Sequence, residues 1–231
     1  MINCIMGTIP DRISILELSI NSIIKQVDRL YISLNDWNKN EIPIFIRNNK
    51  KIKYTICNNS GINVCERWLF CKNFKSFDLI FCIDDDILYP PDYVEKMTSK
   101  LAVYNNKAFI TVHGYSYIDF PINDFIKDKK DFCHFKSEVK ISKKVSVPGV
   151  GTMLSPASLI DIDKISFIPY NNDLCMSKYA RDMNIPIICI EREANWLSPI
   201  SQNIGNKVFK LKEKNRDKQT KIINEVLWNG Q

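Results

Sequence analysis

The sequence predicts an α/β protein with a mostly parallel sheet that is covered by helices on both faces. Short apolar segments alternate along the chain with segments whose apolar residues recur every three or four positions, as strands and helices do. The short segments are apolar at nearly every position rather than at every second one. That pattern is typical of parallel strands buried on both faces by crossover helices.

The elements can be placed in order along the chain. Five strands are predicted in the first half, at residues 2–6, 29–34, 51–57, 77–83 and 108–112. Helices are predicted between them, at residues 13–27, 62–74 and 90–104. The last of these helices starts with two prolines, which suit a first helical turn. In the second half, residues 171–190 are interpreted as a capped helix followed by a strand.

Composition favours an ordinary globular protein of one domain. The 231 residues are 45% hydrophobic and 25% charged, and the formal net charge is +6. The basic excess lies near the C-terminus, where residues 206–221 hold seven Lys or Arg and two acidic residues. This charge alone does not choose between nucleic acid, anionic lipid and phosphorylated small molecules.

The cysteine pattern and the apolar segments indicate a cytoplasmic location. Eight cysteines are present, but four of them lie in apolar segments and no CxxC pair occurs. We therefore expect reduced thiols rather than disulfides or a zinc site. The sequence shows no signal-peptide pattern at its N-terminus and no apolar stretch of about 18 residues.

Polar or turn-forming residues follow each predicted strand. They are residues 8–12, 35–36, 58–61, 84–86 and 113–114. Because the carboxyl ends of parallel strands meet at one edge of the sheet, we expect a ligand site at that edge. Two of only seven glycines, Gly149 and Gly151, lie in a later segment where the backbone is expected to turn sharply or approach a ligand.

Three consecutive carboxylates, Asp84, Asp85 and Asp86, end the fourth strand. Like charges side by side repel one another, so a positive partner is expected. A divalent cation held through an Asp-x-Asp pair, with water and substrate phosphate as further ligands, satisfies that need. The alternative is a solvated turn and helix N-cap before the next helix.

Several segments together resemble bacterial GT-A-type glycosyltransferases, in particular those of glycosyltransferase family 2. They are "MGTIPDRISILELSINSIIKQVDRLYISLN" (6–35), "NNSGINVCERW" (58–68), "FDLIFCIDDDILYPPDYV" (77–94), "HGY" (113–115), "VPGVGTMLS" (147–155) and "NNDLCMSKYARDMNIPIICIEREANWL" (171–197). The resemblance runs from Ile2 to Leu197, and the order of the segments is more specific than any one motif. It implies a GT-A-type, Rossmann-like sheet with a small antiparallel portion on the acceptor side.

The resemblance also implies a nucleotide-sugar site. A donor, with a UDP-sugar favoured, is expected to contact Thr8, Ile9, Pro10, Arg12, Asn35, Asn59, Gly61, Arg67, Asp84 and Asp85. Asp86 and Asp84 are the expected ligands of Mn²⁺ or Mg²⁺. The run of three aspartates leaves open which of them coordinate the metal.

Asp173 resembles the late carboxylate that acts as catalytic base in inverting members of the family. The motif here is Asn-Asn-Asp rather than the commoner Glu-Asp, and a helix N-cap is the alternative role for Asp173. His113, Gly151 and Trp196 are expected on the acceptor side. The acceptor would be a hydroxyl group of a cell-surface glycan or of its lipid-linked precursor.

The predicted organisation is one catalytic domain, 1–205, with a nucleotide-binding half, 1–113, and an acceptor-side half, 114–205. A basic C-terminal helix, 206–231, follows and is either packed on the domain or laid on the inner face of the membrane as a peripheral contact. No nucleic-acid partner is expected, because the basic residues are not interleaved with aromatics in a recognisable module.

Three other functions are compatible with parts of the sequence. A magnesium phosphatase can also use a strand-end Asp-x-Asp, with its first Asp as nucleophile. A nucleotidyltransferase shares the sheet architecture, but "MGTIPDR" lacks a glycine-rich basic loop for a triphosphate. A non-catalytic carbohydrate-binding protein would explain the aromatic residues and the positive charge.

Overall fold

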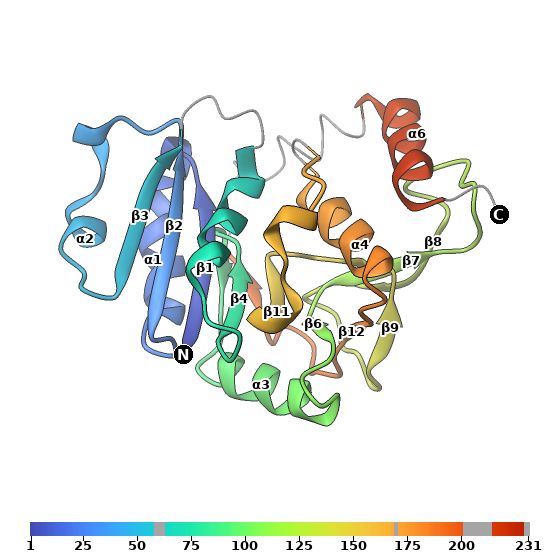
Figure 1. The fold of residues 1–231 in the computed structure, drawn as a ribbon, viewed down its shortest axis with the longest axis horizontal. Coiled ribbons are helices and arrows are strands. Elements are labelled where there is room, and N and C mark those ends of the chain that lie inside the picture. The colour runs from blue at the N-terminus through green and yellow to red at the C-terminus, as the bar shows by residue number, and fades with distance from the viewer. Residues whose placement is uncertain (58–62, 169–170, 201–213, 229–231) are drawn as a thin grey trace.

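The computed structural model describes residues 1–57, 63–168, 171–200 and 214–228 (Figure 1). In this part of the chain, eight strands form one sheet in the order β3-β2-β1-β4-β11-β6-β12-β9. Their bounds are Ile52–Cys57, Arg29–Asn35, Ile2–Thr8, Leu79–Ile83, Thr152–Pro156, Phe109–Thr111, Ile187–Cys189 and Lys143–Val145. Strands β1, β2, β3 and β4 are mutually parallel, as are β6 and β12, whereas β11 and β9 run antiparallel to their neighbours. The mostly parallel sheet predicted from the sequence is therefore confirmed.

The predicted helices are also present, with small differences in extent. They are α1 (Ile13–Ile23), α3 (Tyr93–Val103) and α4 (Asn172–Asp182). The helix expected at 62–74 is a 3₁₀ helix, η3 (Asn63–Asn73), which is more tightly wound than an α-helix. Shorter helices lie in the connections, namely η1 (Pro10–Arg12), η2 (Lys39–Glu41), α2 (Ile44–Arg47), η4 (Ala157–Leu159) and η5 (Ile162–Lys164).

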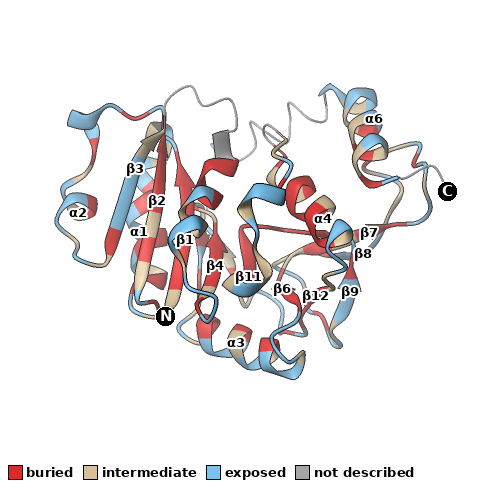
Figure 2. Ribbon diagram, in the orientation of Figure 1, coloured by how far each residue is buried: buried red, intermediate tan, exposed pale blue. Residues whose placement is uncertain are grey.

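Helices cover both faces of the sheet, and successive strand residues enter opposite cores. In β1, Cys4 and Met6 pack with α1 and α3, whereas Ile5 packs with η3 and α4. In β4, Phe81 likewise packs on the side of α1 and α3, and Cys82 packs on the side of η3 and α4. Figure 2 shows the buried residues concentrated along the central strands. Burial on both faces explains why these strands are apolar at almost every position.

Two small antiparallel sheets lie beside the main one. In the first, β7 (Gly114–Tyr117) pairs with β10 (Val147–Pro148) and with β8 (Lys129–Cys133). In the second, β13 (Ser198–Pro199) pairs with β5 (Ile87–Leu88), directly after the three aspartates. The first of these sheets is the small antiparallel portion that the family resemblance implied.

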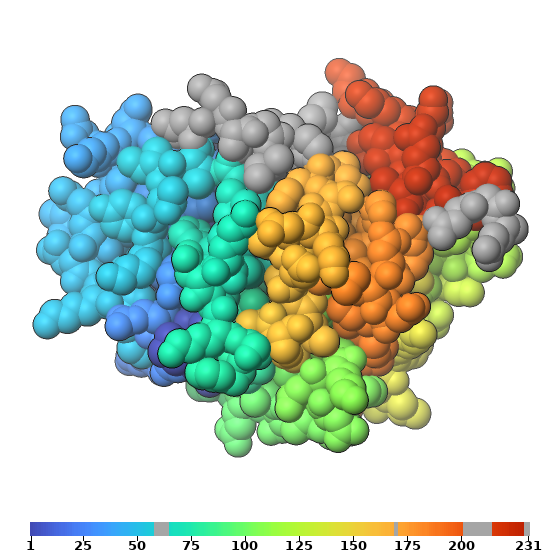
Figure 3. All heavy atoms as spheres, in the orientation of Figure 1, coloured from blue at the N-terminus to red at the C-terminus, as the bar shows by residue number. Residues whose placement is uncertain are grey.

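Of the predicted C-terminal segment 206–231, the structure describes residues 214–228, which contain helix α6 (Arg216–Leu227). Residues 206–213 and 229–231 lie outside the described residues. The buried residues of α6 are Thr220, Ile223 and Leu227. They pack in a cluster with residues from β7, from the β7–β8 connection and from α4, and Figure 3 shows α6 seated against that part of the molecule. No helix in the described part of the chain has the length and apolar character needed to span a bilayer.

Candidate active site

The carboxyl ends of β1, β2 and β4 bring several of the predicted donor residues together. Thr8 ends β1, Asn35 ends β2, and the three aspartates follow β4. Because these strands are parallel neighbours in the order β2-β1-β4, their ends lie at one edge of the sheet. The predicted convergence of these polar strand ends at one edge of the sheet is therefore present.

Arginine and threonine side chains are the partners of the aspartates in this structure. Thr8 Oγ1 donates a hydrogen bond of 2.7 Å to Asp85 Oδ2. Arg12 Nη1 lies 2.8 Å from Asp86 Oδ2 and 3.7 Å from Asp85 Oδ1. Burial alone would lower the pKa of Arg12, but the charges of Asp85 and its neighbours raise it above the ordinary value. Two guanidinium groups, from Arg12 and Arg67, thus face three carboxylates.

The three aspartates are not equivalent. Asp85 is buried, and burial raises its pKa to about 6 although Arg12 and Thr8 act in the opposite direction. The side chains of Asp84 and Asp86 are 43% and 32% exposed. The two outer carboxylates are therefore the ones that a ligand can reach, in the register of an Asp-x-Asp motif.

Arg67 is a buried arginine that orients Asp84. Its Nη1 donates to Ile83 O at 2.7 Å and to Asp84 Oδ1 at 3.0 Å. Desolvation alone would lower the pKa of Arg67, yet the neighbouring Cys82 and Asp84 side chains raise it above its ordinary value. Arg67 was expected to contact the donor diphosphate, and its described contacts also give it a role in positioning the first aspartate.

The glycine turn lies directly against Asp84. A Cβ atom on Gly151 would lie 1.9 Å from Asp84 Oδ2 and 2.1 Å from its Cγ. Tyr89 Oη donates to Gly151 O at 2.6 Å and accepts a hydrogen bond of 2.9 Å from Asp84 N. The close approach therefore requires glycine at position 151, and Tyr89 ties the turn to the aspartate loop.

The residue before Gly151 in the same turn, Val150, contacts Asp173. Val150 N donates to Asp173 Oδ1 at 2.9 Å. Asp173 lies in the first turn of α4, whose N-cap is Asn171, and Asn172 Oδ1 accepts from Trp68 Nε1 at 2.8 Å. Consecutive residues of one turn thus contact Asp84 and Asp173, the candidate metal ligand and the candidate base.

Asp173 lines a cavity of about 390 Å³, called here the Asp173 cavity. Its other lining residues come from in and around β7 and β8, from the start of α4 and from α6. They include His113, Tyr115, Lys129, Phe132, His134 and Gln219. Burial, assisted by the neighbouring groups His134, Lys129 and Arg192, lowers the pKa of His113 to about 3. The imidazole of His113 is therefore neutral in the folded protein at physiological pH.

The remaining predicted residues lie in different surroundings. Ile9 and Pro10 lead from β1 into η1, and Ile9 is exposed. Asn35 is buried, and its Oδ1 has no hydrogen-bond partner among the described residues. Asn59 and Gly61 lie outside the described residues.

Trp196, expected from the resemblance on the acceptor side, contacts the start of α3. Its Nε1 donates to Asp92 Oδ1 at 2.9 Å, at the N-terminus of α3. Its ring packs 5.6 Å from the ring of Tyr93, and it is not among the residues that line the cavity. His113 and Asp173 do line it.

The side chains at the aspartate loop supply only some of the ligands that a small divalent cation needs. Mg²⁺ and Mn²⁺ commonly bind through one or two carboxylates together with water and substrate phosphates. Asp84 and Asp86 supply two partly exposed carboxylates of this kind. Among the residues described, no three His, Cys, Asp or Glu side chains are grouped to hold a metal ion. A cation here would take its remaining ligands from water and a phosphate-bearing substrate.

Some residues of the site were not predicted from the sequence. Tyr89 joins the aspartate loop to the glycine turn, and Phe132 and Gln219 line the Asp173 cavity. A tyrosine five residues after the first aspartate gives no local signal of that contact. Phe132 and Gln219 enter the site only through the pairing of β7 with β8 and the packing of α6.

The fold is similar to that of a solved glycosyltransferase. Residues 1–349 of S. aureus TarS in complex with UDP-GlcNAc align with a TM-score of 0.57 and 12% identity, over 84% of this chain and 56% of that chain. The same protein in complex with UDP gives a TM-score of 0.53 and 10% identity, over 84% of this chain and 58% of that chain. No family model and no curated protein sequence matches the chain. The chain spans less than three fifths of each of these two structures, and the likeness confirms the predicted GT-A-type fold.

Proposed function

We propose that the chain is a glycosyltransferase that moves a sugar from a nucleoside-diphosphate donor, a UDP-sugar by preference, to a hydroxyl group of an acceptor. One observation carries the proposal: the glycine turn contacts Asp84 through Gly151 and Asp173 through Val150. A carboxylate suited to the donor side and a carboxylate suited to the acceptor side thus meet at one turn of a GT-A-type fold. The complexes of S. aureus TarS with UDP-GlcNAc and UDP support the choice of nucleotide.

The donor nucleotide would lie along the ends of β1 and β2. Asn35 Oδ1 is a buried acceptor without a partner in the described residues, so a donor N–H of a nucleobase would satisfy it. Thr8 and Arg12 hold the aspartate loop in the orientation that a bound diphosphate would meet. Asn59 and Gly61 belong to the same proposal through the family resemblance.

The leaving diphosphate needs positive charge, which two arginines and a bound cation would supply. Arg12 and Arg67 supply two charges, while three ionised aspartates leave a formal excess of one negative charge. Asp86 and Asp84 would hold Mn²⁺ or Mg²⁺ there. When bound, the cation would neutralise charge on the departing diphosphate.

Asp173 is the proposed base. An acceptor hydroxyl has a pKa far above neutral, so its proton must be removed as its oxygen attacks the anomeric carbon. The proton would pass to the Asp173 carboxylate while the bond from the anomeric carbon to the phosphate oxygen breaks. Attack from the side opposite the leaving group gives inversion. The hydrogen bond from Val150 N holds the carboxylate in a fixed orientation.

The proposed acceptor is a glycan or a lipid-linked glycan, as in cell-surface polysaccharide synthesis. Peripheral contact with the inner face of the membrane would bring the enzyme to a lipid-linked acceptor. The apolar face of α6 is packed on the domain, so such contact would use only its exposed basic residues.

Calorimetry tests the proposed function directly. UDP, GDP, CDP and a simple phosphate ester would be titrated with and without Mn²⁺ into the wild type, Asp86→Ala and the control Asp182→Ala. Asp182 lies at the far end of α4 from Asp173. We expect metal-dependent binding of UDP that is lost in Asp86→Ala and kept in Asp182→Ala. Absence of binding by any nucleotide would overturn the proposal, and hydrolysis of the ester would indicate a phosphatase.

A further inference from the structure

We infer that the Asp173 cavity binds a neutral, hydroxyl-bearing sugar ring as the acceptor, and that the C-terminal helix α6 forms one wall of this site. The inference rests on the proposed function, because it gives the class of the molecule that Asp173 would deprotonate. The cavity volume of about 390 Å³ lies within the range of about 300–1,000 Å³ typical of small-molecule sites. Gln219 and Ile223 of α6 line it together with Asp173.

Helix α6 is fixed to the domain by polar contacts as well as by its apolar face. Asn224 Nδ2 donates to Ile122 O at 2.9 Å, and Ile122 N donates to Asn224 Oδ1 at 2.8 Å. Phe125 N donates to Thr220 Oγ1 at 3.2 Å. Because these bonds lie on both sides of Ile223, the helix holds its cavity-lining residues in defined positions. Gln219 is thus presented by a fixed element rather than by a loop.

Aromatic side chains supply flat apolar surface in the cavity. Phe132 of β8 is 52% exposed although it is a large hydrophobic residue, and its ring lies 6.1 Å from that of Tyr115 on β7. Lys129 Nζ lies 4.1 Å from the centroid of the Tyr115 ring. An aromatic ring with one accessible face suits stacking against the C–H surface of a sugar.

Two imidazoles supply neutral polar groups suited to hydroxyls. His134 Nδ1 accepts a hydrogen bond of 3.2 Å from Lys136 N, so in the neutral ring the proton lies on Nε2, which can donate. His113 Nδ1 is buried and has no partner among the described residues. Burial lowers the pKa of both histidines, which keeps them uncharged at neutral pH. Neutral donors and acceptors next to aromatic faces suit the hydroxyl groups and the C–H surface of a sugar ring.

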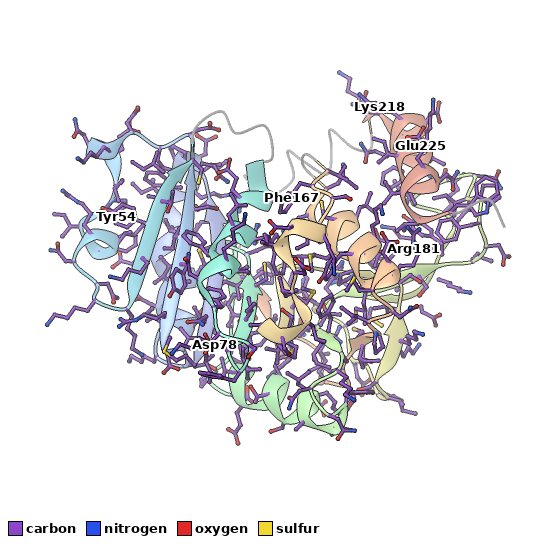
Figure 4. All side chains as sticks on the ribbon, in the orientation of Figure 1. Tyr54, Asp78, Phe167, Arg181, Lys218 and Glu225 are labelled. Carbon is purple, nitrogen blue, oxygen red and sulfur yellow. The ribbon has the colours of Figure 1, made fainter. Side chains whose placement is uncertain are left out.

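Saturation-transfer NMR with simple sugars tests the inference. The probes are the methyl glycosides of glucose, galactose and N-acetylglucosamine, each with UDP present and with the full chain. The test variants are Phe132→Ala and Gln219→Ala, both at sites that are not fully buried. The matched controls are Phe77→Ala, another exposed aromatic, and Lys218→Ala, whose side chain points away from the domain (Figure 4).

With the wild type, we expect saturation-transfer signals from the ring C–H groups of at least one glycoside. These signals should be about fivefold weaker or more in both test variants, because each variant loses one contact with the sugar. They should be unchanged in both controls. Binding of no glycoside, or equal signals in test variants and wild type, would overturn the inference. UDP calorimetry on the same samples distinguishes failure of this inference from failure of the proposed function. UDP binding without a cavity effect would refute only this inference, whereas no UDP binding would refute the proposed function.

Discussion

Asp84 and Gly151 approach so closely that the carboxylate occupies the space a side chain at position 151 would need. A Cβ built on Gly151 lies 1.9 Å from Asp84 Oδ2, far inside van der Waals contact. Arg67 Nη1 lies 3.0 Å from the other carboxylate oxygen, Oδ1. The orientation of Asp84 therefore depends on the buried guanidinium group of Arg67 and on the lack of a side chain at Gly151.

Substituting Gly151 should damage the site without abolishing the fold. In Gly151→Ala the carboxylate of Asp84 must move, and a misplacement of about 1 Å in a catalytic constellation can reduce the rate about 100-fold. The crowding should also lower the free energy of unfolding by about 1–3 kcal/mol. Sugar-transfer assays and urea denaturation would measure the two effects.

A double-mutant cycle tests the cause of that loss. If the clash with Asp84 is responsible, Gly151→Ala should cost little stability in an Asp84→Ala background. An equal cost in both backgrounds would show that the backbone of the turn, rather than the carboxylate, requires glycine.

Removing the charge of Asp173 should separate binding from catalysis. Asn at this position keeps an oxygen that can accept from Val150 N, so the turn should remain in place. It cannot take a proton from the acceptor, and we expect the transfer rate to fall by about 10²–10⁴-fold. UDP affinity, measured by calorimetry, should stay within experimental error of the wild type. Near-normal turnover in Asp173→Asn would refute its role as the base.

The sequence allowed much of the fold to be predicted because its strands are buried on both faces. Residues such as Cys4, Ile5 and Met6 are all apolar, since alternate side chains enter two different cores. The site edge could be predicted for a related reason: parallel strands bring their carboxyl ends together, and those ends are polar here. The aspartates also signalled that a positive partner must lie close.

The identity of that partner could not be read from local patterns. Arg12 lies 74 residues from Asp86 in the chain, and Arg67 lies 17 residues from Asp84. The residues that line the cavity could not be predicted either, because Asn224 of α6 bonds to Ile122, which lies 102 residues earlier in the sequence. Contacts of this range depend on tertiary packing, and hydrophobic periodicity reports only which face of an element is buried.

His113 should make the stability of the protein fall in acid. Its pKa is about 3 in the folded state, where it faces His134, Lys129 and Arg192, and the ordinary value is 6.5. Below pH 6.5 the unfolded chain binds a proton that the folded chain does not, so stability falls as pH decreases toward 3.

Urea denaturation at pH 7.5 and pH 4.5 would measure the effect of His113. Over this interval His113 should account for about 3 kcal/mol of the loss in the free energy of unfolding. His113→Phe should therefore show a shallower pH dependence than the wild type. An identical dependence in the two proteins would mean that His113 is not held neutral in the folded state.

Any contact of α6 with a membrane should be electrostatic and sensitive to salt. The buried residues of α6, Thr220, Ile223 and Leu227, face the domain, whereas Lys218 on the helix and Lys214 just before it are exposed. Each basic residue near an anionic surface contributes about 1 kcal/mol, so Lys214→Glu with Lys218→Glu should reduce binding to anionic vesicles about tenfold or more. Co-sedimentation at low and high salt would measure this. Lys96→Glu on α3, a helix distant from α6 in Figure 1, is the matched control. Equal sedimentation of the wild type and the double variant would exclude α6 as a membrane contact.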